Sequence, residues 1–390
     1  MSLSLDEIEK YIDTLARDEQ TFKQSASTSP EKKPAPPSRS YFSRLVSGVT
    51  FFIRSLLDFI HLYLLVRFDE KSLQGKRIVY TTKNFCNVVD GKLEDRVLKP
   101  LFTDNILFIN PSKEHYLETI NGLKVYNLGG VARLLSYFFK LGPHVLQYFR
   151  AYRVVNDAIL KHLRQREVYT LWFYNVNSLS LIFSRYRKNI TLIEVQHGSM
   201  INYPPFARPA PVKIADLFYV KNQATIDYLK THLCLNFPAE YRLIPYARIQ
   251  REYVPGIHLL YASTVEFNGL HPVMLRFLAT FRRDDLHLII RLHPREKEKE
   301  PLFAAQLAPY QVNYRFDHSP NWLEGNPIQN LIVVSAWSSM IEDSYDNGLL
   351  TILIDPVGKT RYEHLVDNQR CIYTDDLALT LEKILTASRV

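Results

Sequence analysis

The side chains best suited to chemistry in this sequence stand at or just beyond the ends of runs of β-forming residues. In chain order they are Gln196, His197 and Gly198 after TLIEV, Ser263 and Thr264 after IHLLYA, Arg291, His293 and Pro294 at the end of LHLIIRL, and Ser335, Ser338, Ser339 and Glu342 after LIVV. Imidazole, hydroxyl and guanidinium groups donate hydrogen bonds to phosphate and carboxylate oxygens. Because the carboxyl ends of parallel strands meet at one edge of a sheet, we expect each set to line a site for an anionic ligand.

The segment SAWSSMIEDS, residues 335–344, has the pattern of a strand end, a tight turn and a helix start. Free backbone N–H groups and the helix dipole favour an anion at such a turn, and serine hydroxyls add donors. Glu342 falls in the first turns, where the dipole favours negative charge, or it faces the ligand and accepts ribose hydroxyls. The alternative is that Ser335 and Ser338 only cap the helix.

Three carboxylates are candidates for the acid–base or nucleophilic step of a group transfer. Asp90 lies in a loop after the run RIVYTT. Glu194 precedes Gln196 by two residues in a predicted strand, so both side chains point to the same face. Glu266 follows the run IHLLYAS and ranks behind the other two.

β-Forming runs alternate with helical stretches over most of the chain, which predicts parallel sheets covered by helices on both faces. The alternation restarts after a Pro-containing stretch, so we expect two Rossmann-like α/β domains facing a cleft, residues 75–250 and 251–385. The strand-like runs are residues 77–82, 106–110, 123–128, 168–173, 191–195, 217–220, 257–263, 286–292, 331–335, 351–355 and 371–374.

Residues 1–40 are expected to hold one helix and a disordered linker. The helix is predicted over residues 4–23, where Ser4 and Glu7 have the spacing of a capping box. The linker follows because a Pro/Ser/Lys-rich stretch has nothing to bury.

Residues 41–70 predict an amphipathic helix with Arg54, Asp58 and His61 on one face and apolar residues on the other. A charged centre is costly in hydrocarbon, which argues against a membrane span. The helix is expected to pack on the protein, and the alternative is that it lies in the plane of an anionic membrane.

The formal charge of +8 and the pI of about 9.1 favour an acidic partner, such as an anionic membrane or an acidic or phosphorylated sugar. The sequence contains no Gly-rich dinucleotide or P-loop motif and no recognisable nucleic-acid module, so we expect no nucleic-acid partner. Three scattered cysteines without a C-x-x-C pair argue against disulfides. No Asp-x-Asp occurs, so we expect no bound metal.

The order of these motifs resembles a known family. Q-H-G after a strand in the first half, H-P after a strand in the second, and a strand-Ser-x-x-Ser-Ser-helix unit are similar to bacterial surface-polysaccharide glycosyltransferases of GT-B architecture. The likeness is to the capsule and lipopolysaccharide group that uses CMP-sugars, the Kdo transferases and sialyltransferases, over roughly residues 75–380. Sialyltransferases of this kind carry an acidic pair before a Gly, whereas this chain has V-V-D-G at 88–91.

The resemblance implies transfer of an acidic sugar, Kdo favoured and sialic acid second, from a CMP-sugar to a surface glycan or glycolipid. His293, Pro294, Ser338 and Ser339 would then bind the CMP portion, and His197 would bind the leaving phosphate or the sugar carboxylate. The alternatives are a UDP-sugar, GDP-sugar or CDP-glycerol transferase, and a non-catalytic membrane scaffold. The expected location is the cytoplasm, including the inner-membrane surface.

Overall fold

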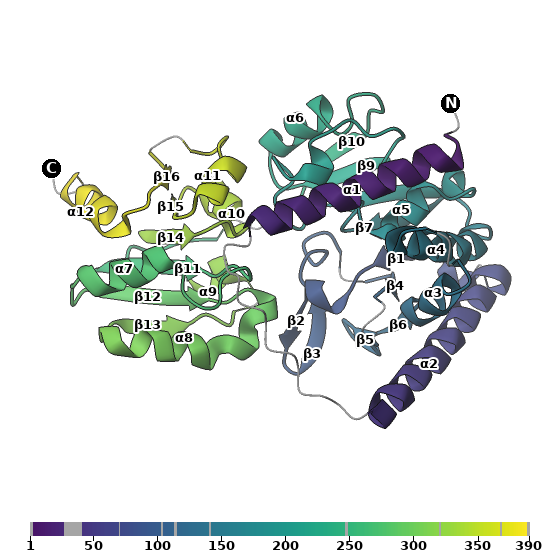
Figure 1. Cartoon of the computed structure of the whole chain (residues 1–390), viewed down its shortest axis with the longest axis horizontal. Helices are drawn as coiled ribbons and strands as arrows, with labels where there is room; N and C mark the ends of the chain where they lie inside the picture. Colours follow the sequence, from purple (N-terminus) through teal and green to yellow (C-terminus); the bar gives the residue numbers. More distant parts are fainter. Residues whose placement is uncertain are drawn as a thin grey trace. The chain divides into compact units, whose positions relative to one another are not determined.

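The computed structural model describes residues 3–26, 41–69, 71–102, 104–112, 115–139, 142–245, 249–319, 321–366 and 369–387. The chain divides into two compact units, one with most residues before 247 and the other with residues 247–390 and two short earlier segments (Figure 1). Each unit contains a parallel sheet with helices, which confirms the predicted α/β class, and each is described by itself. The predicted linker lies outside the described residues from residue 27 onward.

The sheet of the first unit has the strand order β10-β9-β8-β7-β1-β4-β6-β5, parallel except for the short β5. Its strands are β1 (Arg77–Tyr80), β4 (Ile106–Asn110), β5 (Thr119–Ile120), β6 (Leu123–Asn127), β7 (Arg166–Thr170), β8 (Ile190–Val195), β9 (Leu217–Val220) and β10 (Glu240–Leu243). From β1 the chain adds β4 and β6 on one side of the sheet, and it then adds β7 and the later strands on the other side of β1. The pair β1 and β7 is therefore the topological switch point of this sheet.

The sheet of the second unit has the order β13-β12-β11-β14-β15-β16 and is parallel throughout. Its strands are β11 (Ile257–Ala262), β12 (Leu286–Arg291), β13 (Asn313–Phe316), β14 (Leu331–Ser335), β15 (Leu350–Leu353) and β16 (Cys371–Tyr373). Numbered within the unit, this is the order 3-2-1-4-5-6 of a dinucleotide-binding Rossmann sheet. Its switch point lies between β11 and β14.

Helices cover both sheets, and the central strands are buried as continuous apolar runs, as expected for parallel strands. The helices of the first unit are α1 (Leu5–Ala26), α2 (Tyr41–Phe68), α3 (Gly129–Ser136), α4 (His144–Leu160), α5 (Val176–Ile182) and α6 (Gln223–Thr231). Those of the second are α7 (Pro272–Thr280), α8 (Glu300–Leu307), α9 (Trp322–Gly325), α10 (Met340–Asp346), α11 (Pro356–Arg361) and α12 (Leu377–Ala387).

Helix α1 begins with the predicted capping box. The Ser4 backbone N–H donates to Glu7 Oε2 at 2.8 Å, and the Glu7 N–H donates to Ser4 Oγ at 3.3 Å. The helix buries Ile12 and Leu15 against the first unit, and Glu9 pairs with Arg150 at 2.7 Å. The apolar stripe of α1 and the Glu9–Arg150 ion pair therefore hold this helix on the first unit.

Helix α2 packs on the first unit with a mixed face that carries Ser55, Asp58, Leu62 and Val66, whereas most of its apolar stripe is exposed. Asp58 is buried, and its Oδ2 accepts hydrogen bonds from Asn127 N at 3.1 Å and Asn127 Nδ2 at 3.0 Å. Ser55 Oγ donates to Asn127 O at 2.7 Å and accepts from Val131 N at 3.1 Å. These bonds join α2 to the end of β6 and the start of α3.

Every strand-like run named from the sequence overlaps a strand of the structure. The segment predicted as a loop after β1 is instead an antiparallel hairpin, β2 (Cys86–Val89) paired with β3 (Lys92–Asp95). Asp90 and Gly91 form its turn, with φ of 48° and 74°. Both central residues are left-handed, as a two-residue type I′ turn requires, and Asp-Gly suits that turn.

Candidate functional site

In the second unit, the switch point places two hydroxyl-bearing segments side by side. β11 pairs with β14 with Ala262 opposite Ser335, so the residues that follow each strand emerge at one edge. Ser335 Oγ donates to Ala262 O at 2.8 Å and accepts from Ser338 N at 3.1 Å. Ser335 is thus a buried link between the two strand ends, and it shapes the turn that presents Ser338.

Ser338 and Ser339 lie half-buried at the start of α10. Ser338 Oγ accepts from Met340 N at 3.3 Å, whereas Ser339 is the N-cap residue and makes no side-chain cap bond. α10 has 7 residues, and Glu342 within it is fully buried. The capping alternative therefore accounts for Ser335 and Ser338, and a ribose-binding role of Glu342 stays a prediction.

Ser263 and Thr264 follow β11 and are both buried. Ser263 Oγ donates to the buried Glu296 carboxylate at 2.8 Å and accepts from His293 N at 2.8 Å. Thr264 differs, because its Oγ1 is buried and no described residue lies within hydrogen-bonding reach of it. A buried hydroxyl without a partner costs free energy, which makes Thr264 a candidate position for a hydrogen bond to a ligand at this switch point.

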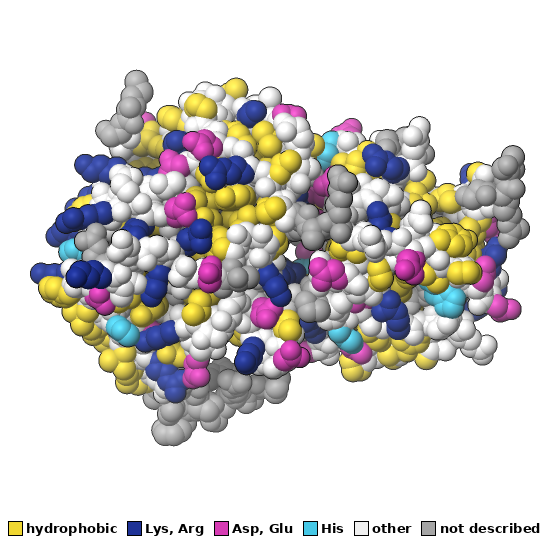
Figure 2. Space-filling view, turned by 180° about the vertical axis from the view of Figure 1, so that it is seen from behind, with side chains coloured by type: hydrophobic (Ala, Val, Ile, Leu, Met, Phe, Trp, Pro, Cys, Tyr) yellow, Lys and Arg dark blue, Asp and Glu magenta, His cyan; other side chains and the backbone are white. Residues whose placement is uncertain are grey.

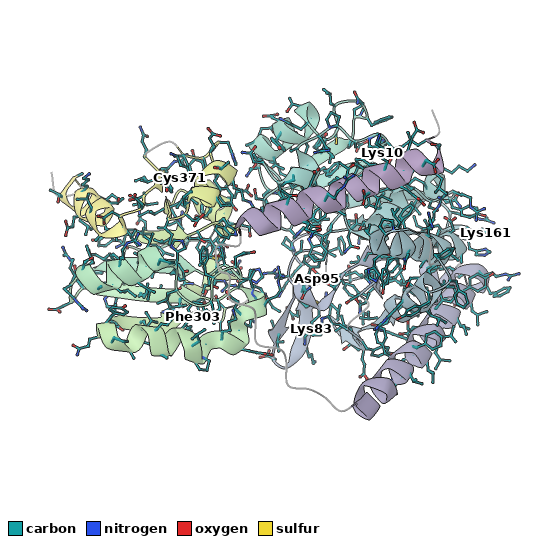
Figure 3. All side chains as sticks on the ribbon, in the orientation of Figure 1. Lys10, Lys83, Asp95, Lys161, Phe303 and Cys371 are labelled. Carbon is teal, nitrogen blue, oxygen red and sulfur yellow. The ribbon has the colours of Figure 1, made fainter. Side chains whose placement is uncertain are left out.

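The first unit repeats this arrangement after β1. Thr81 Oγ1 donates at 2.7 Å to Asp95, which comes from the end of β3 and is labelled in Figure 3. Burial raises the pKa of the Asp95 carboxyl, although bonds from Leu98 N and Thr81 oppose the shift. Thr82 Oγ1 is buried, and the described part of the chain offers it no hydrogen-bond partner. Each switch point thus has one hydroxyl held by a buried carboxylate and one buried hydroxyl left over.

The sequence expectations included Ser263 and Thr264 but missed Thr81, Thr82 and Asp95. The available signal was a pair of adjacent hydroxyl residues directly after the first strand of each half, T-T and S-T. The partner carboxylates come from residues 14 and 33 positions away, and strand-end patterns do not reveal such pairings.

Gln196, His197 and Gly198 follow β8 at the same edge of the first sheet. The Gln196 side chain accepts from Lys221 N at 2.7 Å and donates to Gly198 O at 3.0 Å, so it braces the turn against the end of β9. The His197 ring contacts Phe85 and Trp172 edge-on, and its Nε2 accepts from the Trp172 indole N–H. In the neutral ring the proton therefore resides on Nδ1.

Gly198 is not demanded by the fold. A Cβ built on it meets nothing within 4 Å, and its backbone is not left-handed. Open space beside this backbone, next to a braced imidazole, is suitable for close approach of a ligand.

Glu194 is fully buried in β8, and both of its carboxylate oxygens accept hydrogen bonds from the chain. Thr170 Oγ1 donates to Oε2 at 2.6 Å and Phe173 N donates to Oε1 at 3.0 Å. Burial raises the pKa of this carboxyl to about 7. Glu194 thus holds the end of β7 and the residues after it through the bonds from Thr170 and Phe173. This structural role accounts for a carboxyl inside a buried strand.

His293 and Pro294 form a local cap at the end of β12. Pro294 is the first residue of the 3₁₀ helix Pro294–Lys299, and His293 Nδ1 accepts from Arg295 N at 3.2 Å. His271 caps α7 in the same way, with Nδ1 accepting from Val273 N at 3.2 Å. Capping is therefore one role of His293, and its predicted role in nucleotide binding stays a prediction.

Arg291, a predicted site residue, and Arg208 both form ion pairs within their own units. Arg291 Nη1 donates to Asp317 Oδ2 at 2.5 Å and to Ser319 O at 2.9 Å. Arg208 Nη2 pairs with Asp18 Oδ2 at 2.7 Å. These pairs place Arg291 in a structural bridge between β12 and the segment after β13, where a role in ligand binding would require it to exchange partners.

No group of three or more His, Cys, Asp or Glu side chains within the described ranges is placed to hold a metal ion. Metal independence stays a prediction.

The chain matches no protein-family model and no curated protein. It is similar to the wall teichoic acid polymerase TagF, with 11% identity, a TM-score of 0.46, and coverage of 88% of this chain and 87% of that chain. It is also similar to UDP-GlcNAc 2-epimerase from Neisseria meningitidis bound to UDP-GlcNAc, with 10% identity, a TM-score of 0.42, and coverage of 80% of this chain and 91% of that chain. Acinetobacter baumannii MurG shows 11% identity, a TM-score of 0.41, and coverage of 80% of this chain and 90% of that chain. These likenesses carry no conclusion about activity, and the fold class rests on the sheets described above.

Proposed function

We propose that this protein is a glycosyltransferase of the GT-B type that binds the nucleotide of its donor sugar at the β11–β14 switch point. The observation that carries the proposal is the buried, unpartnered Thr264 hydroxyl, in a sheet whose strand order is that of nucleotide-binding Rossmann domains. Ser338 lies half-buried at the same edge, where a phosphate or ribose group can accept or donate hydrogen bonds.

The donor we favour is a CMP-linked acidic sugar, with Kdo ahead of sialic acid, and the acceptor is a bacterial surface glycan or glycolipid. This choice is supported by the Q-H-G, H-P and serine motifs in their order along the chain. A phosphate and a sugar carboxylate also suit a protein with a formal charge of +8. The proposal includes no obligatory metal.

In the proposed reaction, an acceptor hydroxyl oxygen bonds to the anomeric carbon while the bond from that carbon to the phosphate oxygen breaks. The bonding electrons leave with the phosphate, and a carboxylate takes the hydroxyl proton or first holds the sugar covalently. Asp90 is the carboxylate that we propose, because it is exposed whereas Glu194 is buried with both oxygens occupied. His197 would donate to the phosphate or the sugar carboxylate.

Calorimetric titration of the full chain with CMP, UMP, UDP and GDP tests the proposal. We expect CMP to bind most tightly, and we expect Thr264→Val to weaken that binding by about tenfold, the loss of roughly one hydrogen bond. Thr264→Val should leave the free energy of unfolding unchanged or raise it by about 1 kcal/mol, because it removes an unsatisfied buried hydroxyl. Thr280→Val, an exposed site on α7, is the matched control and should bind normally.

The outcomes separate the alternatives. Tighter binding of UDP or GDP would discard the CMP donor and favour a UDP-sugar or GDP-sugar transferase, and tests with CDP-glycerol would follow. Failure to bind any of the nucleotides would overturn the transferase proposal and leave the membrane scaffold.

A further inference from the structure

Helix α2 leaves most of its apolar stripe exposed, unlike an ordinary surface helix. Ser55, Asp58, Leu62 and Val66, at spacings of three and four, are buried against the first unit. The opposite face is apolar and exposed; its residues are Val49, Ile53, Leu56, Leu57, Ile60, Leu64 and Phe68. A helix that packs on its protein normally buries its apolar stripe, so this exposed stripe needs another partner.

Helix α3 packs against α2 and carries further exposed apolar side chains toward its end. The two helices approach closely at Gly130, where a Cβ would lie 2.6 Å from Ser55 Cβ. Leu134 is one turn further along α3, and Tyr137 and Phe138 follow its last residue with their side chains exposed. We call the exposed α2 residues, together with Leu134, Tyr137 and Phe138, the apolar face. Figure 2 shows hydrophobic side chains along its lower left edge, where α2 lies.

Basic side chains border the apolar face. Arg54 and Arg67 on α2, Lys71 just after it and Arg133 on α3 are all exposed. Arg67 lies over the Phe68 ring at 4.8 Å, so its stem follows the apolar surface while its charge stays at the border. Aromatic and aliphatic residues bordered by Arg and Lys are the composition that binds an anionic bilayer surface.

We propose that the apolar face lies in the plane of an anionic lipid bilayer and holds the first unit on that surface. Gly48–Phe68 is long and apolar enough to cross a membrane by length and composition alone. Crossing would break the bonds of Asp58 and Ser55 to Asn127 and Val131, whereas an in-plane position keeps them. A second copy is a poorer partner, because it would bring the same basic border against itself.

Co-sedimentation of the full chain with vesicles tests this proposal. The vesicles contain phosphatidylcholine alone or phosphatidylcholine and phosphatidylglycerol in equal parts. We expect the wild-type chain to pellet with the anionic vesicles and less with the neutral ones. The double variant L57E/L64E should bind the anionic vesicles at least about tenfold more weakly, because both leucines are exposed and would insert a carboxylate. The control is Leu235→Glu, since Leu235 is 58% exposed and Leu57 is 60% exposed.

The expected result is loss of pelleting in L57E/L64E, normal pelleting in Leu235→Glu and the same melting temperature in all three chains. Equal pelleting of the wild type and L57E/L64E would overturn the proposal, as would a wild type that stays in solution with both vesicles. A wild-type dimer that L57E/L64E converts to a monomer would assign the apolar face to a second copy instead. None of these outcomes depends on the nucleotide titration.

Discussion

Glu194 couples the stability of the first unit to pH. Burial raises the pKa of its carboxyl to about 7, well above the 4.5 of a glutamate in an unfolded chain. The folded chain therefore binds this proton more tightly than the unfolded chain does. The stability from the neutral carboxyl is fully present below about pH 4.5 and is lost as the pH rises through about 7.

Glu194→Gln should remove this pH dependence, because a carboxamide of the same shape stays neutral. Between about pH 5 and pH 8, the wild type should lose about 2–3 kcal/mol of unfolding free energy that the variant keeps. Urea unfolding of both chains at the two pH values measures the difference. Parallel pH profiles for the two chains would show that Glu194 is not the group responsible.

Asp90 has two separable properties, its backbone and its charge. Asn adopts the left-handed conformation about as readily as Asp, so Asp90→Asn should leave the β2–β3 hairpin and the stability unchanged. If Asp90 is the catalytic carboxylate, the rate of sugar transfer should fall by about 10²- to 10⁴-fold. Normal transfer by Asp90→Asn would reduce Asp90 to a turn residue and move attention to Glu266.

The docking of α2 depends on polar contacts, which makes it sensitive to one side chain. Asp58→Ala would leave the buried Asn127 N–H without its acceptor and remove one of the bonds of Asn127 Nδ2, which keeps its bond to Leu117 O, so the unfolding free energy should drop by about 1–3 kcal/mol. Leu57→Ala on the exposed face should change it by less than about 0.5 kcal/mol. Chemical unfolding of the two variants tests this ranking, and an equal effect of both would contradict the described packing.

Sequence patterns predicted the strands well because each core strand is a compact run of β-forming residues. The β2–β3 hairpin escaped prediction because its strands are short and partly polar, although Asp-Gly is a hairpin signal. The face on which α2 docks was also beyond prediction. Periodicity separates the polar and apolar faces of a helix. It does not show that the buried N–H groups of Asn127 will donate hydrogen bonds to Asp58 on this helix.

The candidate site was only partly readable from the sequence. Strand ends located Ser263, Thr264 and His197, because parallel strands bring their carboxyl ends to one edge. Which hydroxyls are held by the chain and which are left over depends on the carboxylates Asp95 and Glu296. Their positions follow from a hairpin and a short helix whose tertiary placement local patterns do not encode.

The two units have separate hydrophobic cores, so unfolding is expected in two steps. A nucleotide bound to the second unit should raise the unfolding free energy of that unit alone. The increase should be about 2.7 kcal/mol when the nucleotide concentration is a hundred times Kd. Calorimetry with and without CMP measures this, and Thr264→Val should abolish the shift. A nucleotide that raises both steps equally would not be bound by the second unit alone.

The most direct test is a crystal structure of the full chain with the nucleotide that binds most tightly. The account predicts that a nucleotide oxygen lies about 2.7–3.2 Å from Thr264 Oγ1, at the edge formed by β11 and β14. A nucleotide bound at another place, with the Thr264 hydroxyl still lacking a partner, would contradict the account.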